Sequence, residues 1–134
     1  MAMAIDGKTP LHLAARGTTQ PEVILALLQA GANVMAQDED GETPMHCASR
    51  NNNPAIIRIL LDFGGDVMAS NAEGLTPLHI AAIEAMKPEI IQTLLNVGAD
   101  KKAKDKNGRT PFYYAQENEI LKFNKGHLVL RNAN

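Results

Sequence analysis

Three histidines recur at nearly equal spacing along this chain of 134 residues, at His12, His46 and His79. Histidine is a common general base and the commonest metal ligand in proteins. A shared zinc ion would need all three ring nitrogens within about 2.1 Å of one point. The same interval separates repeated segments of the chain, so we expect one histidine per unit, on helices about 8–10 Å apart. We therefore predict a structural role for these histidines and no metal site.

The single cysteine, Cys47, directly follows His46, which raises the possibility of a nucleophile beside its base. Adjacent helical residues do not face each other, however, and Leu13 and Ile80 hold the equivalent places in other units. We expect Cys47 to be a core residue whose thiol is inert because burial raises its pKa. The sequence has no glycine-rich phosphate loop, no zinc-type cluster and no strand–turn–helix serine motif. We therefore predict no enzyme, no catalytic residue and no cofactor.

Composition is that of a globular domain rather than a disordered chain, with 45% apolar and 21% charged residues. The formal net charge of −2 provides no general attraction to nucleic acid or acidic membranes. One cysteine cannot form an internal disulfide and suits a reducing compartment. The N-terminus does not have the pattern of a secretory signal, and no apolar run approaches the ~20 residues that span a bilayer. We expect an intracellular, cytoplasmic location.

The segment DGKTPLHLAARG, residues 6–17, returns three times, as DGETPMHCASRN, EGLTPLHIAAIE and NGRTPFYYAQEN. The threonines of this motif stand at 9, 43, 76 and 110. A second segment also recurs, as PEVILALLQAGANV, PAIIRILLDFGGDV and PEIIQTLLNVGADK. A fixed period of 33–34 residues indicates an array of stacked units.

Each unit is predicted to contain two short helices. Thr-Pro is a helix start, because threonine caps the first turn and proline fits the first helical position. The second helix starts at Pro21, Pro54 and Pro88 and carries an apolar stripe at helical spacing. A glycine, at 31, 64 or 98, then ends it. Because one helix pair cannot bury its stripe alone, stacked pairs are expected to share a continuous core.

The T-P-L-H-x-A-A motif, the paired aliphatic stripe and the G-A-D/N turn strongly resemble ankyrin repeats over residues 1 to about 118. The resemblance implies an all-α solenoid of helix–turn–helix units joined by β-hairpin-like fingers. The expected units are 6–39, 40–72, 73–106 and 107–134, the last a degenerate capping repeat. An extra residue between the helices in units one and three is similar to bacterial ankyrin arrays. Delivery into a host cell would then be an option.

The resemblance implies that each histidine ties its helix start to the backbone of the neighbouring finger. Met1-Ala2 aligns with Met35-Ala36, so the sequence begins part-way through a finger. We expect a piece of a longer array. The alternative function is self-association through the first unit's edge, within a larger ankyrin protein whose other domains carry the activity.

The resemblance also implies a function: ankyrin arrays bind partner proteins through a concave groove formed by finger tips and the first exposed positions after the alanine pair. The second finger is acidic, the fourth is basic, and Leu75 and Ile83 are apolar candidates between them. The alternative is that these charges only keep the array soluble. The predicted partner-binding residues are Glu39, Asp40, Glu42, Arg50, Asn51, Glu73, Leu75, Ile83, Glu84, Lys106, Asn107 and Arg109.

A nucleic-acid surface at the fourth finger is a less favoured alternative. Lysines and an arginine crowd residues 101–109, and Phe112, Tyr113 and Tyr114 follow. Phe112 and Tyr114 hold places that are leucine or isoleucine in other units, so we expect them in the core. The favoured prediction is a non-enzymatic protein-interaction module, whether scaffold, inhibitor or effector-type adaptor, with no small-molecule substrate and no membrane partner. The sequence does not identify the partner.

Overall fold

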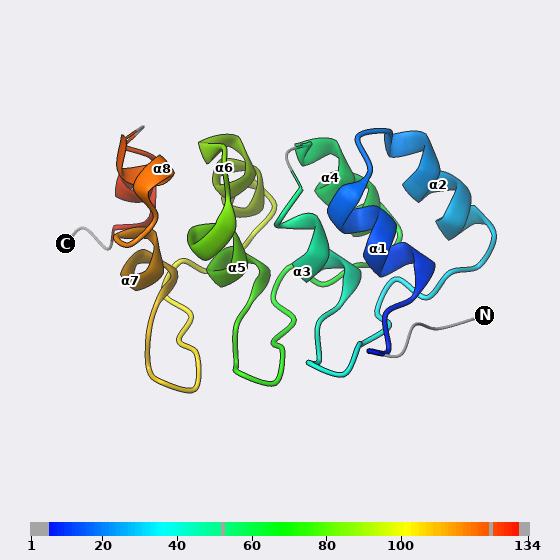
Figure 1. Ribbon diagram of the computed structural model, residues 1–134, viewed down its shortest axis with the longest axis horizontal. Coiled ribbons are helices and arrows are strands. Elements are labelled where there is room, and N and C mark those ends of the chain that lie inside the picture. Colours follow the sequence, from blue (N-terminus) through cyan, green and yellow to red (C-terminus); the bar gives the residue numbers. More distant parts are fainter. Residues whose placement is uncertain (1–5, 52, 124, 132–134) are drawn as a thin grey trace.

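The computed structural model describes residues 6–51, 53–123 and 125–131, which form a row of helix pairs with loops projecting from one side (Figure 1). The helices are α1 (Pro10–Gly17), α2 (Pro21–Gln29), α3 (Pro44–Ala48), α4 (Pro54–Asp62), α5 (Pro77–Glu84), α6 (Pro88–Asn96), α7 (Pro111–Ala115) and α8 (Glu119–Phe123). A 3-10 helix, η1 (Gly126–Leu130), follows. The predicted all-α solenoid is confirmed.

The helices form two rows. Helices α1, α3, α5 and α7 pack side by side in chain order, and α2, α4 and α6 form the second row (Figure 1). Helix η1 packs on α6, α7 and α8 at the C-terminal end. A core of aliphatic side chains, including Ile24, Ile57, Leu78 and Leu94, runs between the rows.

The loops that project from the row, here called fingers, are narrow hairpins closed by backbone hydrogen bonds. In fingers two, three and four the N–H groups of Asp38, Asn71 and Asp105 each donate to the carbonyl four residues later, at 3.0 Å. Neighbouring fingers are also joined, because Ala72 N–H donates to the Asp40 carbonyl at 2.8 Å. No strand is assigned within the described ranges, so the fingers resemble β-hairpins in their hydrogen bonds alone.

Helix starts and ends follow the predicted signals. Thr9, Thr43, Thr76 and Thr110 are N-cap residues, and a proline occupies the first helical position of helices α1 to α7. Gly31, Gly64 and Gly98 follow α2, α4 and α6 with φ of 96°, 95° and 106°. This left-handed conformation costs glycine little and other residues more, so these turns depend on glycine.

One core assignment from the sequence is wrong. Cys47 and Ile80 are each 2% exposed, as expected, but Leu13, their counterpart in the first unit, is 55% exposed. Cys47 and Ile80 lie in α3 and α5, each of which has the first helix of another unit before it. Leu13 lies in α1, the first described helix, so its burial depends on a neighbour that the described residues do not provide.

Candidate functional site

The three histidines each join a helix start to the next finger. The Nε2 atoms of His12, His46 and His79 lie 2.8 Å from the carbonyl oxygens of Glu42, Leu75 and Arg109. In each case the Nδ1 atom accepts from the N-cap threonine's own N–H, at 3.0 to 3.1 Å. These contacts define a neutral ring that donates through Nε2 and accepts through Nδ1. The predicted structural role of the histidines is confirmed.

Burial favours the neutral forms of the His46 and His79 rings and of the neighbouring thiol. It lowers the pKa of His46 and of His79, because a buried imidazolium loses its hydration. Burial also raises the pKa of the Cys47 thiol to about 11, so the thiolate is scarce at neutral pH. Among residues 6–51, 53–123 and 125–131, no group of three or more His, Cys, Asp or Glu side chains is placed to hold a metal ion.

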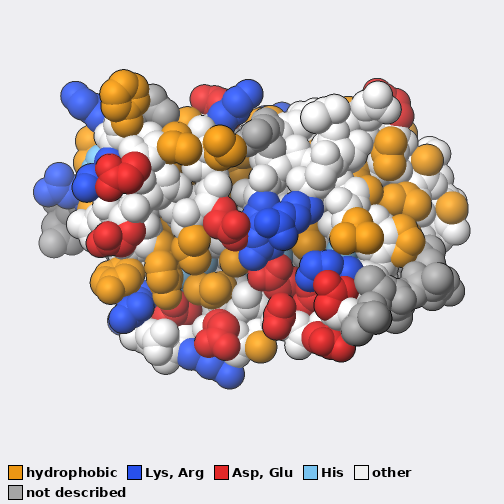
Figure 2. All heavy atoms as spheres, viewed as in Figure 1, with side chains coloured by type: hydrophobic (Ala, Val, Ile, Leu, Met, Phe, Trp, Pro, Cys, Tyr) orange, Lys and Arg blue, Asp and Glu red, His pale blue; other side chains and the backbone are white. Residues whose placement is uncertain are grey.

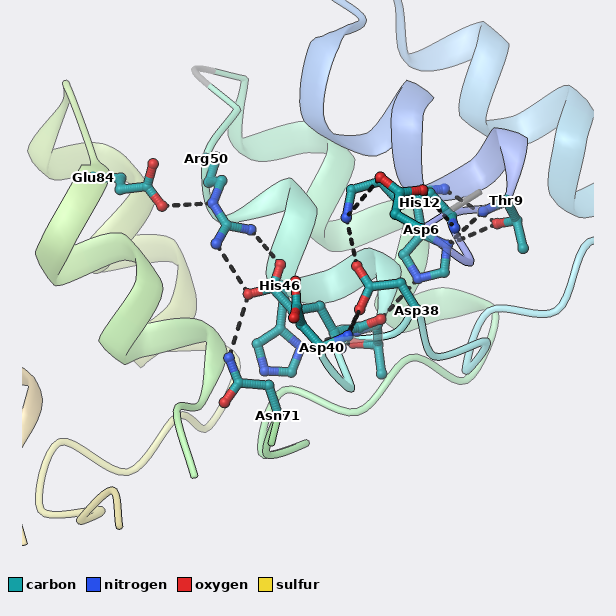
Figure 3. A network of polar contacts seen from close by, with 12 residues as sticks. Asp6, Thr9, His12, Asp38, Asp40, His46, Arg50, Asn71 and Glu84 are labelled. Atoms are coloured by element: carbon teal, nitrogen blue, oxygen red, sulfur yellow. Dashed lines mark hydrogen bonds and ion pairs between the residues drawn. The ribbon is translucent and has the colours of Figure 1, made fainter. Parts of the chain in front are cut away.

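Arg50 connects the second and third units through two carboxylates (Figure 3). Its Nη1 and Nη2 donate to the two oxygens of Glu42 at 2.6 and 3.0 Å, and its Nε donates to Glu84 at 2.6 Å. Asn71 of the next finger also donates to Glu42, at 3.3 Å. Burial alone would raise the pKa of Glu42, but the hydrogen bonds and positive charge of Arg50, together with the bond from Asn71, outweigh burial and lower that pKa.

Another ion pair, between Lys8 and Asp38, stabilises the acidic second finger. Lys8 Nζ lies 2.6 Å from Oδ2 of Asp38, whose side chain is fully covered. The other carboxylate oxygen of Asp38 accepts from the N–H groups of Asp40 and Glu42, at 2.9 Å each. Asn71 and Asp105 hold the next two fingers in the same way. Asp38 therefore shapes the finger, and the acidic side chains exposed on it are Glu39 and Asp40.

Asn51 is a structural residue that sequence reasoning placed on the binding surface. Its Nδ2 donates to the carbonyls of Ala15 and Thr18, at 3.0 and 2.7 Å, which ties the second unit to the end of α1. Asn118 makes the same kind of contact, because its Nδ2 donates to the carbonyls of Ala82 and Ala85 at 3.2 and 3.1 Å. Both asparagines stand eight residues after the N-cap threonine of their own unit. The recurrence of asparagine at this register is the signal that could have identified this role.

The twelve predicted partner-binding residues therefore divide into three groups. Glu42 and Asn51 are buried, so the expectation that they are exposed is wrong: the Glu42 carboxylate is held by Arg50 of the same unit, and the Asn51 amide donates to the preceding unit. Arg50 and Leu75 are half-buried. The exposed ones are Glu39, Asp40, Glu73, Ile83, Glu84, Lys106, Asn107 and Arg109.

These exposed residues lie on fingers two, three and four and at the C-terminal end of α5, and we call this set of positions the inner face. In Figure 2, acidic side chains lie below a basic group at the centre of the view, and acidic and basic side chains are both present at the lower left, next to apolar ones. Arg109 on the fourth finger stands 4.5 Å from the centre of the Tyr113 ring, which is 45% exposed. Ile83 at the end of α5 is 39% exposed.

The aromatic residues beside the basic finger have intramolecular partners. Phe112 and Tyr114 are half-buried, and the Tyr114 hydroxyl donates to Asp105. The ring of His127 stacks on Phe112, with centroids 6.3 Å apart. These two rings, with Gln116 and Lys122, line an open pocket of about 210 Å³. Of the three aromatic side chains in α7, Tyr113 is the exposed one.

The helix pairs, fingers and histidine ties define an array of ankyrin type. The chain belongs to the ankyrin repeat family, because the family model described as ankyrin repeats (3 copies) matches residues 11–105 and 63–124. Repeats of this family are generally protein–protein interaction modules and typically lack enzymatic activity. No helix in the described ranges is both long and apolar enough to cross a membrane.

Curated proteins match parts of the chain. Rabankyrin-5 of Mus musculus is 54% identical over 48 residues, which are 36% of this chain and 4% of that protein. Rabankyrin-5 of Homo sapiens is 56% identical over 45 residues, 34% of this chain and 4% of that protein. Neurogenic locus notch homolog protein 4 of Homo sapiens is 52% identical over 42 residues, 31% of this chain and 2% of that protein. The matched segments are thus a small fraction of each relative's length.

Proposed function

We propose that this chain is a non-enzymatic binding module that recognises a segment of another protein on its inner face. The observation that carries the proposal is the distribution of exposed side chains. The residues that hold neighbouring units together are aliphatic core residues, or histidines and asparagines that hydrogen-bond to a neighbouring unit. The residues exposed on the inner face, in contrast, differ in type from unit to unit. Selectivity for a partner can therefore come from exposed residues that are not needed to hold the fold together. The single reduced thiol fits a cytoplasmic location.

The charges and apolar residues of the inner face suggest the chemistry of the segment. Glu39, Asp40 and Glu73 are exposed on fingers two and three, and Lys106 and Arg109 are exposed on finger four. Ile83 and Tyr113 supply exposed apolar surface close to this boundary. A segment with basic residues at one end, acidic residues at the other and an apolar anchor between them complements this pattern.

Two matched triple variants test the face. The inner-face variant carries Glu39→Lys, Asp40→Lys and Ile83→Glu, and the control carries Glu22→Lys, Asp62→Lys and Leu25→Glu on the exposed sides of α2 and α4. Both make the same change in net charge and replace one exposed aliphatic residue. A protein captured from lysate by the unmodified chain and the control, but lost by the inner-face variant, would support the proposal. Equal capture by all three would contradict it.

A random peptide library, selected on the unmodified chain and depleted on the inner-face variant, tests the complementarity. We expect the retained peptides to carry Lys or Arg at one end and Asp or Glu at the other. Peptides without charge polarity would contradict that part of the proposal. Binding of single-stranded nucleic acid that weakens steeply with salt would instead favour the basic finger as a nucleic-acid surface.

A further inference from the structure

Each finger turns at a residue that is followed by glycine, and these pairs differ in their chemistry. They are Asp6–Gly7, Asp40–Gly41, Glu73–Gly74 and Asn107–Gly108. The four glycines share a φ between 75° and 80°, so the turns have the same backbone form. Asn107 is exposed on finger four, and it is the one asparagine in the sequence that precedes a glycine.

An asparagine before glycine can react with its own main chain. The glycine nitrogen attacks the side-chain amide carbon, its proton leaves with the amide nitrogen as ammonia, and a five-membered succinimide ring forms. Water then opens the ring at either carbonyl and gives aspartate or isoaspartate, with no oxidant or reductant. Glycine favours ring closure because it has no Cβ to shield its nitrogen or restrict its backbone. A carboxylate is attacked less readily than an amide, and glutamate would need a six-membered ring, so Asn107–Gly108 is the most reactive of the four pairs.

In the first three fingers, the following finger restrains the reacting pair. The carbonyls of Asp6, Asp40 and Glu73 accept from backbone N–H groups of that finger, at 3.0, 2.8 and 3.0 Å. A Cβ at the glycine of each pair would lie 2.9 to 3.1 Å from a backbone nitrogen of the same finger. Ring closure has to rotate the pair, so it must first break this contact.

Finger four, which projects at the end of the row beside α7, has no such restraint (Figure 1). Within the described ranges, no N–H group donates to the Asn107 carbonyl, and a Cβ at Gly108 would meet nothing within 4 Å. Tyr113 stands where the other three units have the histidine that bonds to the following finger. The fourth unit therefore has no histidine to hold a further finger against Asn107.

We propose that Asn107 is a site of spontaneous modification, at which ring closure onto Gly108 converts the amide to aspartate and isoaspartate. The product places a carboxylate between Lys106 and Arg109, two exposed basic residues of finger four. Isoaspartate also lengthens the main chain between the N–H groups of residues 107 and 109, which both donate to Asp105 at 2.9 Å. The reaction thus lowers the positive charge of the finger and disturbs its turn, and any effect on a partner rests on the proposed function of the inner face.

Incubation in heavy-oxygen water tests the site directly, because each opened ring retains one oxygen atom from the solvent. The unmodified chain is held at mildly alkaline pH, digested in ordinary water and mapped by mass spectrometry. We expect label at residue 107 before residues 6 and 40, with aspartate and isoaspartate both present. If residue 107 stays unlabelled in the folded chain while the urea-unfolded chain acquires label there, the proposal fails.

The matched variant is Asp40→Asn, which places an asparagine before Gly41 on finger two. The two pairs then have the same chemistry and the same bond within the turn, from Gly41 N–H to Asp38 at 3.0 Å and from Gly108 N–H to Asp105 at 2.9 Å. After each rate is divided by its value in urea, residue 107 should react about 10-fold faster than residue 40, because residue 40 must first lose its contact with the third finger. Equal normalised rates would overturn the proposal.

Asn107→Gln separates the modification from its effect on a partner, because glutamine keeps the amide but does not form the five-membered ring. Peptides selected on the inner face should bind the two fresh proteins equally, and after equal incubation they should bind Asn107→Gln more tightly. Label at residue 107 with unchanged peptide binding would confirm the modification and contradict a role for finger four in the proposed function. Absence of label would overturn the modification whatever the peptides do.

Discussion

Arg50 lies 2.6 Å from Glu84, and this ion pair links the loop after α3 to the end of α5 (Figure 3). The same guanidinium holds Glu42 through two hydrogen bonds. Burial would by itself lower the pKa of Arg50, but the bonds to Glu42 and Glu84 outweigh it and raise that pKa. Arg50 is thus mainly a structural residue, and Glu84 is the more exposed member of the network.

We expect unequal effects from removing the two ends of this network. Arg50→Met should lower the free energy of unfolding by about 2–3 kcal/mol, because it leaves the buried Glu42 carboxylate without its guanidinium. Glu84→Gln should cost about 0–1 kcal/mol, because an exposed carboxylate is well hydrated. Urea unfolding at neutral pH measures both. Equal costs would show that Glu42 does not depend on Arg50.

The asparagine tie gives a prediction that separates structure from binding. Asn51→Ala should cost about 1–3 kcal/mol, because two carbonyls at the end of α1 lose a buried donor. Asn107→Ala on the exposed fourth finger should change stability by less than about 0.5 kcal/mol. Thermal unfolding followed by circular dichroism tests the pair. If Asn51→Ala unfolds at the same temperature as the unmodified chain, Asn51 does not stabilise the array, and its predicted role as a partner-binding residue would be favoured again.

The sequence was sufficient to predict features that depend on local chemistry. Thr-Pro helix starts and glycine ends follow from capping and backbone conformation, which a single unit already displays. The histidine ties between units were instead implied by the resemblance to ankyrin repeats. Leu13 and Asn51 could not be assigned from their own unit. The burial of Leu13 depends on whether a neighbour covers it, and Asn51 acts on carbonyls of another helix. Polar residues after the alanine pair therefore look alike in sequence whether they tie units together or face solvent.

Finger glycines allow backbone strain to be separated from crowding. Gly41, Gly74 and Gly108 have φ of 76°, 77° and 75°, so alanine is strained at all three. A Cβ at Gly41 or Gly74 would lie 2.9 Å from a backbone nitrogen of the next finger, whereas one at Gly108 meets nothing within 4 Å.

We expect Gly108→Ala to cost about 1 kcal/mol and Gly41→Ala at least about 1 kcal/mol more. The additional cost arises because the second finger must move away from the third, which also weakens the bond from Ala72 N–H to Asp40. Urea unfolding compares the variants, and hydrogen exchange at Ala72 reports the finger contact. Similar losses of stability in Gly41→Ala and Gly108→Ala would mean that the contact between the second and third fingers contributes nothing to the free energy of unfolding.

The histidine ties predict how stability depends on pH. Burial lowers the pKa of His46 and His79 from the ordinary value of 6.5. In the unfolded chain both regain that value, so below about pH 6.5 the unfolded state binds more protons than the folded state. The free energy of unfolding should therefore fall as the pH drops from about 7.5 to about 5.5. The carboxyl groups of Asp38, Glu42 and Asp105 titrate below this window, because their pKa values are lowered from 3.8, 4.5 and 3.8.

His79→Gln is the sharpest test of this dependence. Glutamine can accept from the N-cap N–H as the imidazole does, but it does not titrate. At neutral pH the variant should lose about 1 kcal/mol, because the hydrogen bond to the Arg109 carbonyl is removed. Between about pH 7.5 and about pH 5.5 its stability should fall by less than that of the unmodified chain, since His46 is then the one remaining histidine whose pKa burial lowers. Urea unfolding at a series of pH values measures the slope. An unchanged slope in His79→Gln would mean that the ring of His79 stays neutral in both states or is not buried in the folded one.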